Sequence, residues 1–400
     1  MRALAVADSD SYLKWSAATL AALPTGWQTE QVVIKNPIAP SQAQMHAAVG
    51  RPIATLSLPQ LIMKMLRERP DVLVLGCTGP VVRALVELPL FRLRRRPILL
   101  TGLPGISIPA TERAVALRSG CDLLVVHSHR ERAEFAELAA ELAPQLQIGL
   151  ARLPFLDHDP QLDAAAGPTP RTPAEPPADV VFAAQAKVPA SWEHRRLVLS
   201  TLARLPSGMH PVVKLRADAG EEQTHREQFP YPEVYAALLA RGELPEDRTQ
   251  PVRFSSGAMS VALASAAGFV TVSSTSALEA ISHGVDVVIL SDFGVSAETI
   301  NVVFEGSDCL GTLDDVANGR FFRPDQIWMR QNYFHPEADS DWLEKLWELA
   351  EQRRAGGLPV SRVRPSGSAA SRWRRLLRLL LPEAAWSVLR RVRSSLPRHR

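Results

Sequence analysis

Short apolar runs alternate with segments of helical pattern along most of this 400-residue chain, and this alternation constrains the fold more than any other feature. Strands buried on both faces read as continuous apolar runs, and a helix after each strand returns the chain to start a parallel neighbour. The alternation therefore predicts an α/β fold with doubly wound parallel sheets. The runs expected to form buried strands are residues 3–7, 72–76, 98–102, 123–127, 180–185, 211–216, 269–274 and 285–290.

A stretch rich in proline and alanine, residues 164–179, interrupts this alternation as a linker does. Because 400 residues exceed the usual size of one hydrophobic core, we expect two Rossmann-like domains, residues 1–163 and 180–335. Residues 336–360 are expected to form a closing helix, and residues 361–400 a separate tail.

The tail, residues 361–400, holds eleven arginines and a single acid, Glu383, so its charge is +10. The whole chain carries +3, which leaves the first 360 residues acidic. Two amphipathic helices are predicted, since apolar residues recur at helical spacing before and after Pro382. Arginine, tryptophan and leucine in this pattern favour binding in the interface of an anionic membrane. A disordered tail, or one packed on the protein, is the alternative.

The three cysteines, Cys77, Cys121 and Cys309, lie far apart and fit neither a disulfide framework nor a zinc site. Neither a signal peptide nor an apolar stretch long enough to span a membrane is found in the sequence. We therefore expect a cytoplasmic protein, peripheral on the inner face of the plasma membrane through the tail. Neither a cofactor nor a nucleic-acid partner is expected.

Hydroxyl residues crowd the junction between an apolar run and a helical segment in "FVTVSSTSALEAISHGVDVVIL", residues 269–290. Ligands of parallel sheets bind beyond the carboxyl ends of the strands, and a helix N-terminus there attracts anions. We interpret Ser273, Ser274 and Thr275 as a phosphate cradle; the alternative is that one of them caps the helix. Glu279 lies about one turn inside this helix, within reach of a ribose hydroxyl.

A second segment of this kind is "HPVVKLRADAGEEQTH", in which Lys214 and Arg216 share one face of a strand end. Two cations there can neutralise a diphosphate or a carboxylate. The flanking Glu221, Glu222 and His225 can orient them or contact a sugar. Surface salt bridges are the alternative for each of these residues.

At these motifs the chain resembles a group of predicted glycosyltransferases found mainly in actinobacteria. The similar stretches are "ADSDSYLKW", "KLR…GE.QTH" and "SSTSALEA…G", within a resemblance that covers roughly residues 1–340. More distantly, the chain is similar to bacterial polysialyl- and Kdo-transferases of capsule synthesis, whose paired serines correspond to Ser273 and Ser274. The resemblance implies a GT-B fold, with two Rossmann-like domains facing a cleft and a nucleotide-sugar as donor substrate.

In such an enzyme the N-terminal domain binds the acceptor and supplies the catalytic base. Asp8, Ser9, Asp10, Ser11 and Lys14 follow the first strand, and a carboxylate there can take a proton from an acceptor hydroxyl. Metal binding by the two aspartates, or helix capping by the second of them, are the alternatives.

Two further loops of this domain are expected to line the same rim. Gly105 permits close approach of the backbone, and Glu112 is a second candidate base. His127 and Ser128 follow another strand, although a lone histidine at a strand end is more often structural. In the C-terminal domain, Asn301 lies in a loop predicted to read a base or sugar edge.

The sequence and the resemblance together predict metal-independent transfer of a sugar to a cell-surface polysaccharide or a lipid-linked acceptor. Lys214 and Arg216, with the hydroxyl cradle, would stabilise the departing phosphate in place of a metal ion. A nucleotide-sugar epimerase or a glycerol-phosphate transferase of the same fold is an alternative. A non-catalytic scaffold at the membrane is another.

Overall fold

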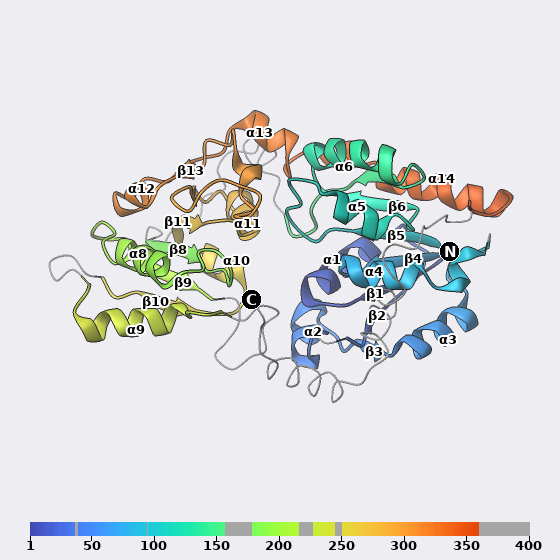
Figure 1. Cartoon of the computed structure of the whole chain (residues 1–400), viewed down its shortest axis with the longest axis horizontal. Coiled ribbons are helices and arrows are strands. Elements are labelled where there is room, and N and C mark those ends of the chain that lie inside the picture. The colour runs from blue at the N-terminus through green and yellow to red at the C-terminus, as the bar shows by residue number, and fades with distance from the viewer. Residues whose placement is uncertain (37–38, 94, 157–177, 216–226, 245–249, 360–400) are drawn as a thin grey trace, which may run out of the picture. The chain divides into compact units, whose positions relative to one another are not determined.

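The computed structural model describes residues 1–36, 39–93, 95–156, 178–215, 227–244 and 250–359 (Figure 1). The chain forms two compact units. Among the described residues, the first combines Met1–Pro154 with residues 336–359, and the second lies within Phe155–His335. The predicted tail and the Pro/Ala-rich linker up to residue 177 lie outside the described residues.

The first unit is built on a seven-stranded parallel sheet with the strand order β3-β2-β1-β4-β5-β6-β7. Its strands are β1 (Arg2–Ala7), β2 (Gln28–Ile34), β3 (Ala54–Leu56), β4 (Val72–Gly76), β5 (Ile98–Gly102), β6 (Leu123–Val126) and β7 (Gln147–Leu150). The order reverses direction between β1 and β4, which makes the carboxyl ends of these two strands the switch point of the sheet.

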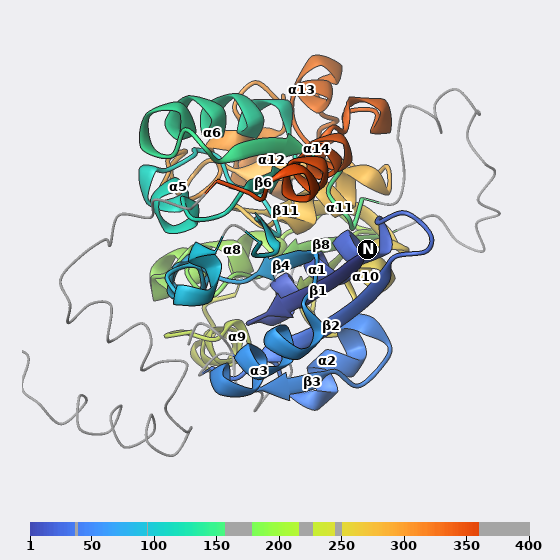
Figure 2. The same ribbon diagram turned by 90° about the vertical axis from the view of Figure 1, so that its right-hand side faces the viewer.

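Helices cover both faces of this sheet, as Figure 2 shows. They are α1 (Asp10–Ala21), α2 (Gln42–Val49), α3 (Leu58–Glu68), α4 (Gly79–Val86), η1 (Pro89–Arg92), α5 (Glu112–Arg118), α6 (His129–Leu142), η3 (Glu337–Asp339) and α14 (Trp342–Ala355). Alternate residues of a strand face opposite sides, so Ala3 and Ala5 pack with α1 and α14. Leu4 and Val6 pack with α3, α4, α5 and α6 on the other face.

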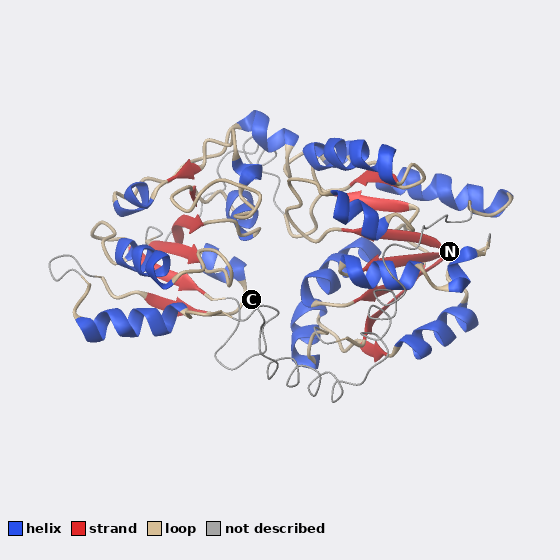
Figure 3. Cartoon of the chain, in the orientation of Figure 1, coloured by secondary structure: helices blue, strands red, loops and turns tan. Residues whose placement is uncertain are grey.

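The second unit is built on a six-stranded parallel sheet with the strand order β10-β9-β8-β11-β12-β13 (Figure 3). Its strands are β8 (Asp179–Ala183), β9 (His210–Lys214), β10 (Arg253–Ser255), β11 (Ala266–Thr271), β12 (Val287–Leu290) and β13 (Leu310–Gly311). The helices are α8 (Trp192–Leu202), α9 (Tyr231–Arg241), α10 (Met259–Leu263), α11 (Ser276–Ser282), η2 (Val302–Phe304), α12 (Leu313–Ala317) and α13 (Gln326–Gln331). The switch point of this sheet lies between β8 and β11.

Every apolar run predicted as a strand forms one, and every strand pairing in both sheets is parallel. The sequence-based prediction of two doubly wound parallel sheets is therefore confirmed. The strands that it missed are β2, β3, β7, β10 and β13. Among the helices of the described segments, none is long and apolar enough to cross a membrane.

Candidate functional site

Gln185 and Ser273 meet at the switch point of the second sheet, each just beyond the end of its strand. The Gln185 Oε1 atom accepts the Ser273 backbone N–H at 2.9 Å, and the Gln185 Nε2 atom lies 3.0 Å from the Ser273 hydroxyl oxygen. One amide thus joins the ends of β8 and β11, the place where parallel sheets bind ligands. Sequence analysis overlooked Gln185, although its position as the last residue of a predicted strand, 180–185, is the signal that could have identified it.

The other cradle hydroxyls have different surroundings. Ser274 accepts a hydrogen bond from the Ser276 backbone N–H at 3.2 Å, and its own N–H donates to the Thr271 hydroxyl at 3.3 Å. Thr275 is the N-cap residue of α11, where its side chain makes no capping hydrogen bond to any described residue. Ser274 thus satisfies the first N–H of α11, as the capping alternative expects of one hydroxyl, whereas Ser273 bonds to Gln185 instead.

The backbone N–H groups of Ala277 and Leu278, near the start of α11, are hydrogen-bonded within their own segment of the chain. The N–H groups of Ala277 and Leu278 donate to the carbonyl oxygens of Ser274 and Thr275, at 3.0 Å and 2.9 Å. This helix has seven residues. The prediction that the first N–H groups of α11 form the anion site is therefore not supported for these two amides. The hypothesis of a phosphate cradle depends instead on the hydroxyl groups as donors.

Lys214 ends β9 and is almost completely buried, with an exposed fraction of 4%. Its ammonium group donates to the carbonyl oxygens of Gly257 at 2.8 Å and Leu215 at 3.3 Å. The lysine thus brings a positive charge to the carboxyl edge of this sheet. The residues predicted to act with it, Arg216, Glu221, Glu222 and His225, lie outside the described residues.

A fully buried arginine, Arg195 of α8, holds the segment that carries Gln185. Its guanidinium also forms an ion pair with Glu227 at 3.3 Å and lies 4.6 Å from the centre of the Tyr231 ring. Several planar donors on one rigid group can fix several backbone carbonyls at once. The carbonyl oxygens that accept from Arg195 belong to Gln185, Ala186, Pro189 and Phe229.

The remaining predicted residues of this unit are Glu279 and Asn301. Glu279 is half-buried on α11, and its carbonyl oxygen lies 2.8 Å from the His283 Nδ1 atom. Asn301 is fully buried: its amide donates to the Gly294 carbonyl oxygen at 3.0 Å and accepts the Thr299 hydroxyl at 2.7 Å. This geometry makes Asn301 a brace for its loop and does not support the prediction that it reads a base or sugar edge.

In the first unit, Asp8 and Thr78 meet at the switch point between β1 and β4. The Asp8 Oδ2 atom accepts the backbone N–H of Thr78 at 2.8 Å and its hydroxyl at 2.5 Å. The Oδ1 atom is buried and has no hydrogen-bond partner in the described part of the chain. Burial raises the pKa of Asp8, because desolvation outweighs the hydrogen bonds from Thr78.

Arg118 and Tyr12 lie near this carboxyl group. The guanidinium of Arg118 is buried and donates to the Tyr12 hydroxyl at 2.9 Å. Burial raises the pKa of Tyr12, so the phenol stays protonated. The positive charge of Arg118 lowers the pKa of Asp8, but by less than burial raises it. The arrangement offers one carboxylate oxygen that can receive a proton.

Asp10 and Ser11, which follow Asp8 in sequence, are more exposed to solvent than Asp8 is. Asp10 forms an ion pair with Lys14 at 2.9 Å, and both side chains are about half exposed. Ser9 is the N-cap residue of α1, so the alternative that Asp10 caps this helix is wrong by one residue. Ser11 is exposed. Of the two aspartates proposed as bases, Asp8 is therefore the one at the switch point.

His127 is buried, and both of its ring nitrogens are engaged. Its Nε2 atom accepts the indole N–H of Trp15 at 2.9 Å, and its Nδ1 atom lies 3.0 Å from the Ala151 carbonyl oxygen. These partners assign the proton to Nδ1. His127 is thus a structural residue here, as the alternative stated, and the geometry does not support a role in catalysis. Ser128 caps α6 by accepting the Glu131 N–H at 3.0 Å.

Glu131, a residue that sequence analysis overlooked, ties the two rim loops together. Its carboxylate is buried and accepts the N–H of Ser107 at 2.9 Å and that of His127 at 2.8 Å. Gly105 lies in the first of these loops, where its carbonyl oxygen accepts the Ser107 hydroxyl at 3.2 Å. Glu112 begins α5 and is exposed, so it lacks the burial that distinguishes Asp8.

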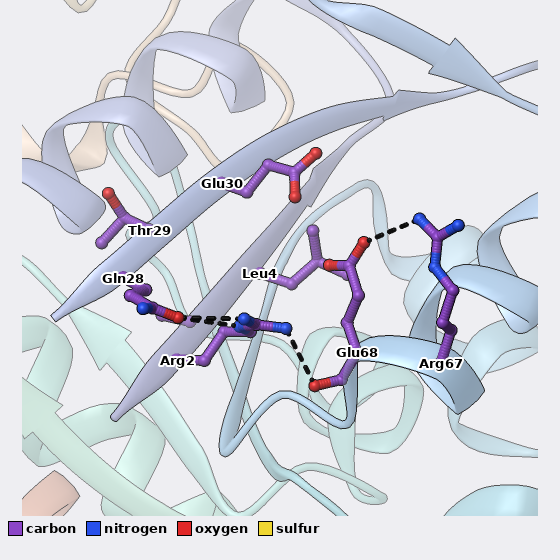
Figure 4. A pocket seen from close by; sticks show the side chains of 8 residues that line it. Arg2, Leu4, Gln28, Thr29, Glu30, Arg67 and Glu68 are labelled. Carbon is purple, nitrogen blue, oxygen red and sulfur yellow. Dashed lines mark hydrogen bonds and ion pairs between the residues drawn. The ribbon is translucent and has the colours of Figure 1, made fainter.

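A pocket of about 330 Å³ lies at the opposite edge of this sheet (Figure 4). Arg2, which begins β1, contacts the Gln28 side chain at 3.0 Å and the Glu68 carbonyl oxygen at 3.1 Å. Glu68 pairs with Arg67 in turn. The pocket thus lies at the amino ends of the strands, whereas parallel sheets bind ligands at the carboxyl ends, so it is not the candidate site.

Solved structures of similar fold cover nearly the whole chain. UDP-GlcNAc 2-epimerase from Methanocaldococcus jannaschii has a TM-score of 0.53 and 12% identity, over 87% of this chain and 99% of that one. S. aureus MnaA, solved with UDP, has a TM-score of 0.50 and 11% identity, over 93% of this chain and 94% of that one. Anabaena HepE, solved with UDP and glucose, has a TM-score of 0.46 and 16% identity, over 99% and 100%. The predicted GT-B fold class, with two parallel sheets and helices, is confirmed by the first two of these structures and by the strand order of both sheets.

Among curated proteins, none matches the chain. One family model does match, and it spans residues 3–349, which include both switch points and the first part of helix α14. The match bears out the resemblance to glycosyltransferases drawn from the sequence. The chain belongs to the family described as "Putative glycosyltransferase (DUF6716)".

Proposed function

We propose that the protein transfers a sugar from a nucleotide-activated donor, and that the second unit binds the donor at the switch point between β8 and β11. The observation that carries this proposal is the Gln185–Ser273 pair, which fixes a hydroxyl donor at the carboxyl edge of the sheet. Ser274 and Thr275 add hydroxyl groups beside it. Diphosphate oxygens are acceptors that such hydroxyls can bind.

Departure of the nucleotide leaves negative charge on its phosphate, and groups already aimed at that charge lower the barrier. Lys214 supplies a positive charge at the end of β9, and Arg216, two residues further along, is proposed to add a second. With two cations and the hydroxyl row, the leaving group needs no metal ion. Transfer should therefore persist in excess chelator; loss of activity that magnesium or manganese restores would contradict this part of the proposal.

In the first unit, Asp8 is proposed as the base that takes the proton from the acceptor hydroxyl. Its free oxygen, Oδ1, lies at the switch point of the sheet, and its raised pKa strengthens it as a base. The acceptor is proposed to be a cell-surface polysaccharide or a lipid-linked glycan. The basic tail, residues 361–400, would bring the enzyme to the inner face of the plasma membrane.

Calorimetry against UDP-, CMP-, GDP- and CDP-linked compounds tests the donor site. UDP is the first nucleotide to try, because MnaA was solved with it. Ser273→Ala combined with Ser274→Ala should weaken nucleotide binding by about 1–3 kcal/mol, since two hydrogen bonds to a charged group are lost. Ser207→Ala, an exposed hydroxyl in the same unit, is the matched control. Unchanged affinity in the folded double variant would refute the cradle.

Product analysis separates transfer from the alternative reactions. An epimerase converts its nucleotide-sugar without any acceptor, whereas a transferase releases the nucleotide in step with glycosylation of the acceptor. A non-catalytic scaffold would show neither product. Incubation of the protein with the bound nucleotide-sugar, with and without acceptor, therefore decides among the three.

A further inference from the structure

Large apolar side chains are strongly exposed on α3 and on the segment after η1. The exposed fractions are 66% for Met63, 55% for Leu66 and 64% for Leu93. They are the most exposed large apolar residues among those described in the first unit; Leu142 and Trp347 follow at 40% and 38%. Exposed apolar side chains that gather on one surface mark a binding face more often than scattered ones do.

Met63 and Leu66 lie on the outer side of α3, and Leu93 follows the η1 segment on the same face of the sheet. Leu58, Leu61 and Met65 of α3 pack into the core, so helical spacing turns Met63 and Leu66 outward. Leu88 and Leu90 of the η1 segment pack against the same core cluster as Ile62 of α3. Both segments therefore cover the same face of the first sheet.

Arginines flank the apolar side chains. The Arg67 side chain is 80% exposed, and Arg69 and Arg95 are exposed as well. The adjacent Arg96 is buried in a two-point ion pair with Asp122, at 2.6 Å and 2.7 Å, which anchors the segment that carries Leu93 and Arg95. The surface thus combines protruding apolar groups with positive charge on a fixed backbone.

We propose that this α3 surface, formed by Met63, Leu66, Leu93, Arg67, Arg69 and Arg95, binds an anionic lipid bilayer. Apolar side chains at such a surface enter the boundary of the acyl chains, and guanidinium groups remain among the headgroup phosphates. Each basic residue near an anionic membrane strengthens binding about fivefold. The α3 surface is distinct from the tail, and its binding does not depend on the proposed enzymatic reaction.

A fluorophore attached at Leu66 tests contact with lipid directly. The native Cys77, Cys121 and Cys309 are buried, and burial raises the pKa of each thiol, so a cysteine introduced at the surface is labelled selectively. An environment-sensitive dye on Leu66→Cys in the full chain should shift to the blue with phosphatidylserine/phosphatidylcholine vesicles. Leu239→Cys, which is also 55% exposed but lies in the second unit, should not shift. No shift at position 66, or an equal shift at both positions, overturns the proposal.

A second experiment measures affinity. Met63→Asp combined with Leu66→Asp in the full chain should weaken sedimentation with these vesicles tenfold or more. Leu239→Asp combined with Ile327→Asp, two exposed apolar residues of the second unit, should leave it unchanged. Equal binding by the α3 variant and wild type overturns the proposal.

The alternative partner for the α3 surface is a second copy of the chain. Analytical ultracentrifugation without vesicles should give the same oligomeric state for wild type and for the α3 variant. If the variant turns a dimer into a monomer while vesicle binding is unchanged, the surface is a subunit interface and the membrane proposal is wrong.

Discussion

At the residue scale, the carboxyl group of Asp8 has a proposed function that conflicts with its effect on stability. Asp8 buries one oxygen without a partner in the described chain, and such a group costs free energy because it loses its water. Asp10, two residues later, makes an exposed ion pair of the kind that contributes little. A residue kept at a cost to stability is a stronger candidate for catalysis than one that costs nothing.

Replacing Asp8 with Asn should separate the role of Asp8 in catalysis from its cost to stability. The asparagine oxygen can still accept from Thr78, but it cannot take a proton, so transfer should fall about 100-fold or more. Melting temperature at pH 8 should stay equal or rise. Asp10→Asn is the matched control and should change stability by less than about 0.5 kcal/mol, with activity retained. An active Asp8→Asn protein would exclude Asp8 as the base.

The stability of Asp8→Asn relative to wild type should depend on pH. The pKa of Asp8 is raised in the folded protein, so the folded state binds the Asp8 proton more tightly than the unfolded state does. Proton binding therefore stabilises the fold at low pH, and this stabilisation is lost as the pH rises through the pKa of the folded state. The stability of Asp8→Asn relative to wild type should therefore increase as the pH rises from 4, by about 1.4 kcal/mol for each unit of pKa shift. Denaturant unfolding between pH 4 and pH 8 measures it. A difference that does not vary with pH contradicts the raised pKa.

At the scale of elements, the end of β5 and helix α1 fit each other through Gly102. A Cβ atom at Gly102 would lie 2.0 Å from the Trp15 ring carbon Cζ2, a distance that real atoms do not adopt. Trp15 in turn donates its indole N–H to His127 after β6. The absence of a side chain at Gly102 therefore makes room for a core tryptophan.

Gly102→Ala should consequently destabilise the protein by about 1–3 kcal/mol, because the core is overpacked and Trp15 must move. Urea unfolding of the purified variant provides the value. Gly356→Ala is the matched control, since a Cβ atom there meets no atom within 4 Å. If both variants unfold at the same urea concentration, the packing of Trp15 tolerates the extra methyl group and this account is wrong.

At the scale of the whole molecule, the chain returns to its first unit before the basic tail begins. α14 packs Trp342, Leu346 and Leu349 into the core of the first sheet. Just before the tail, Leu358 is buried, and the Pro359 carbonyl oxygen accepts from Arg96 at 3.3 Å. The body of the chain is acidic and the tail is basic, which is the separation expected when the tail serves a partner outside the catalytic body.

Deleting residues 361–400 should therefore weaken sedimentation with anionic vesicles tenfold or more and leave nucleotide binding intact. The contacts of Leu358 and Pro359 are kept, so the truncated protein should fold. Rising salt should weaken vesicle binding by the full chain, since screening acts on its electrostatic part. Vesicle binding as strong as that of the full chain would show that the tail is not a membrane contact.

The sequence by itself determined the interior strands of both sheets except β2, and it missed all four edge strands. β1, β4, β5, β8 and β11 lie between other strands and are buried on both faces, so they are unbroken apolar runs. β3, β7, β10 and β13 are edge strands, and β2 lies next to one; the first half of β2 is exposed. Polar residues and short lengths hide such strands from a search for apolar runs.

The sequence also determined that hydroxyl and acidic residues follow these strands. Only the tertiary structure decided which of them meet. Gln185 and Ser273 are 88 residues apart, and Asp8 and Thr78 are 70 apart. Each pair forms because β8 lies beside β11 and β1 beside β4, and strand order depends on how the helices pack on the sheet. The same packing buries Asp8 and leaves Asp10 in water, although both follow the same strand in sequence.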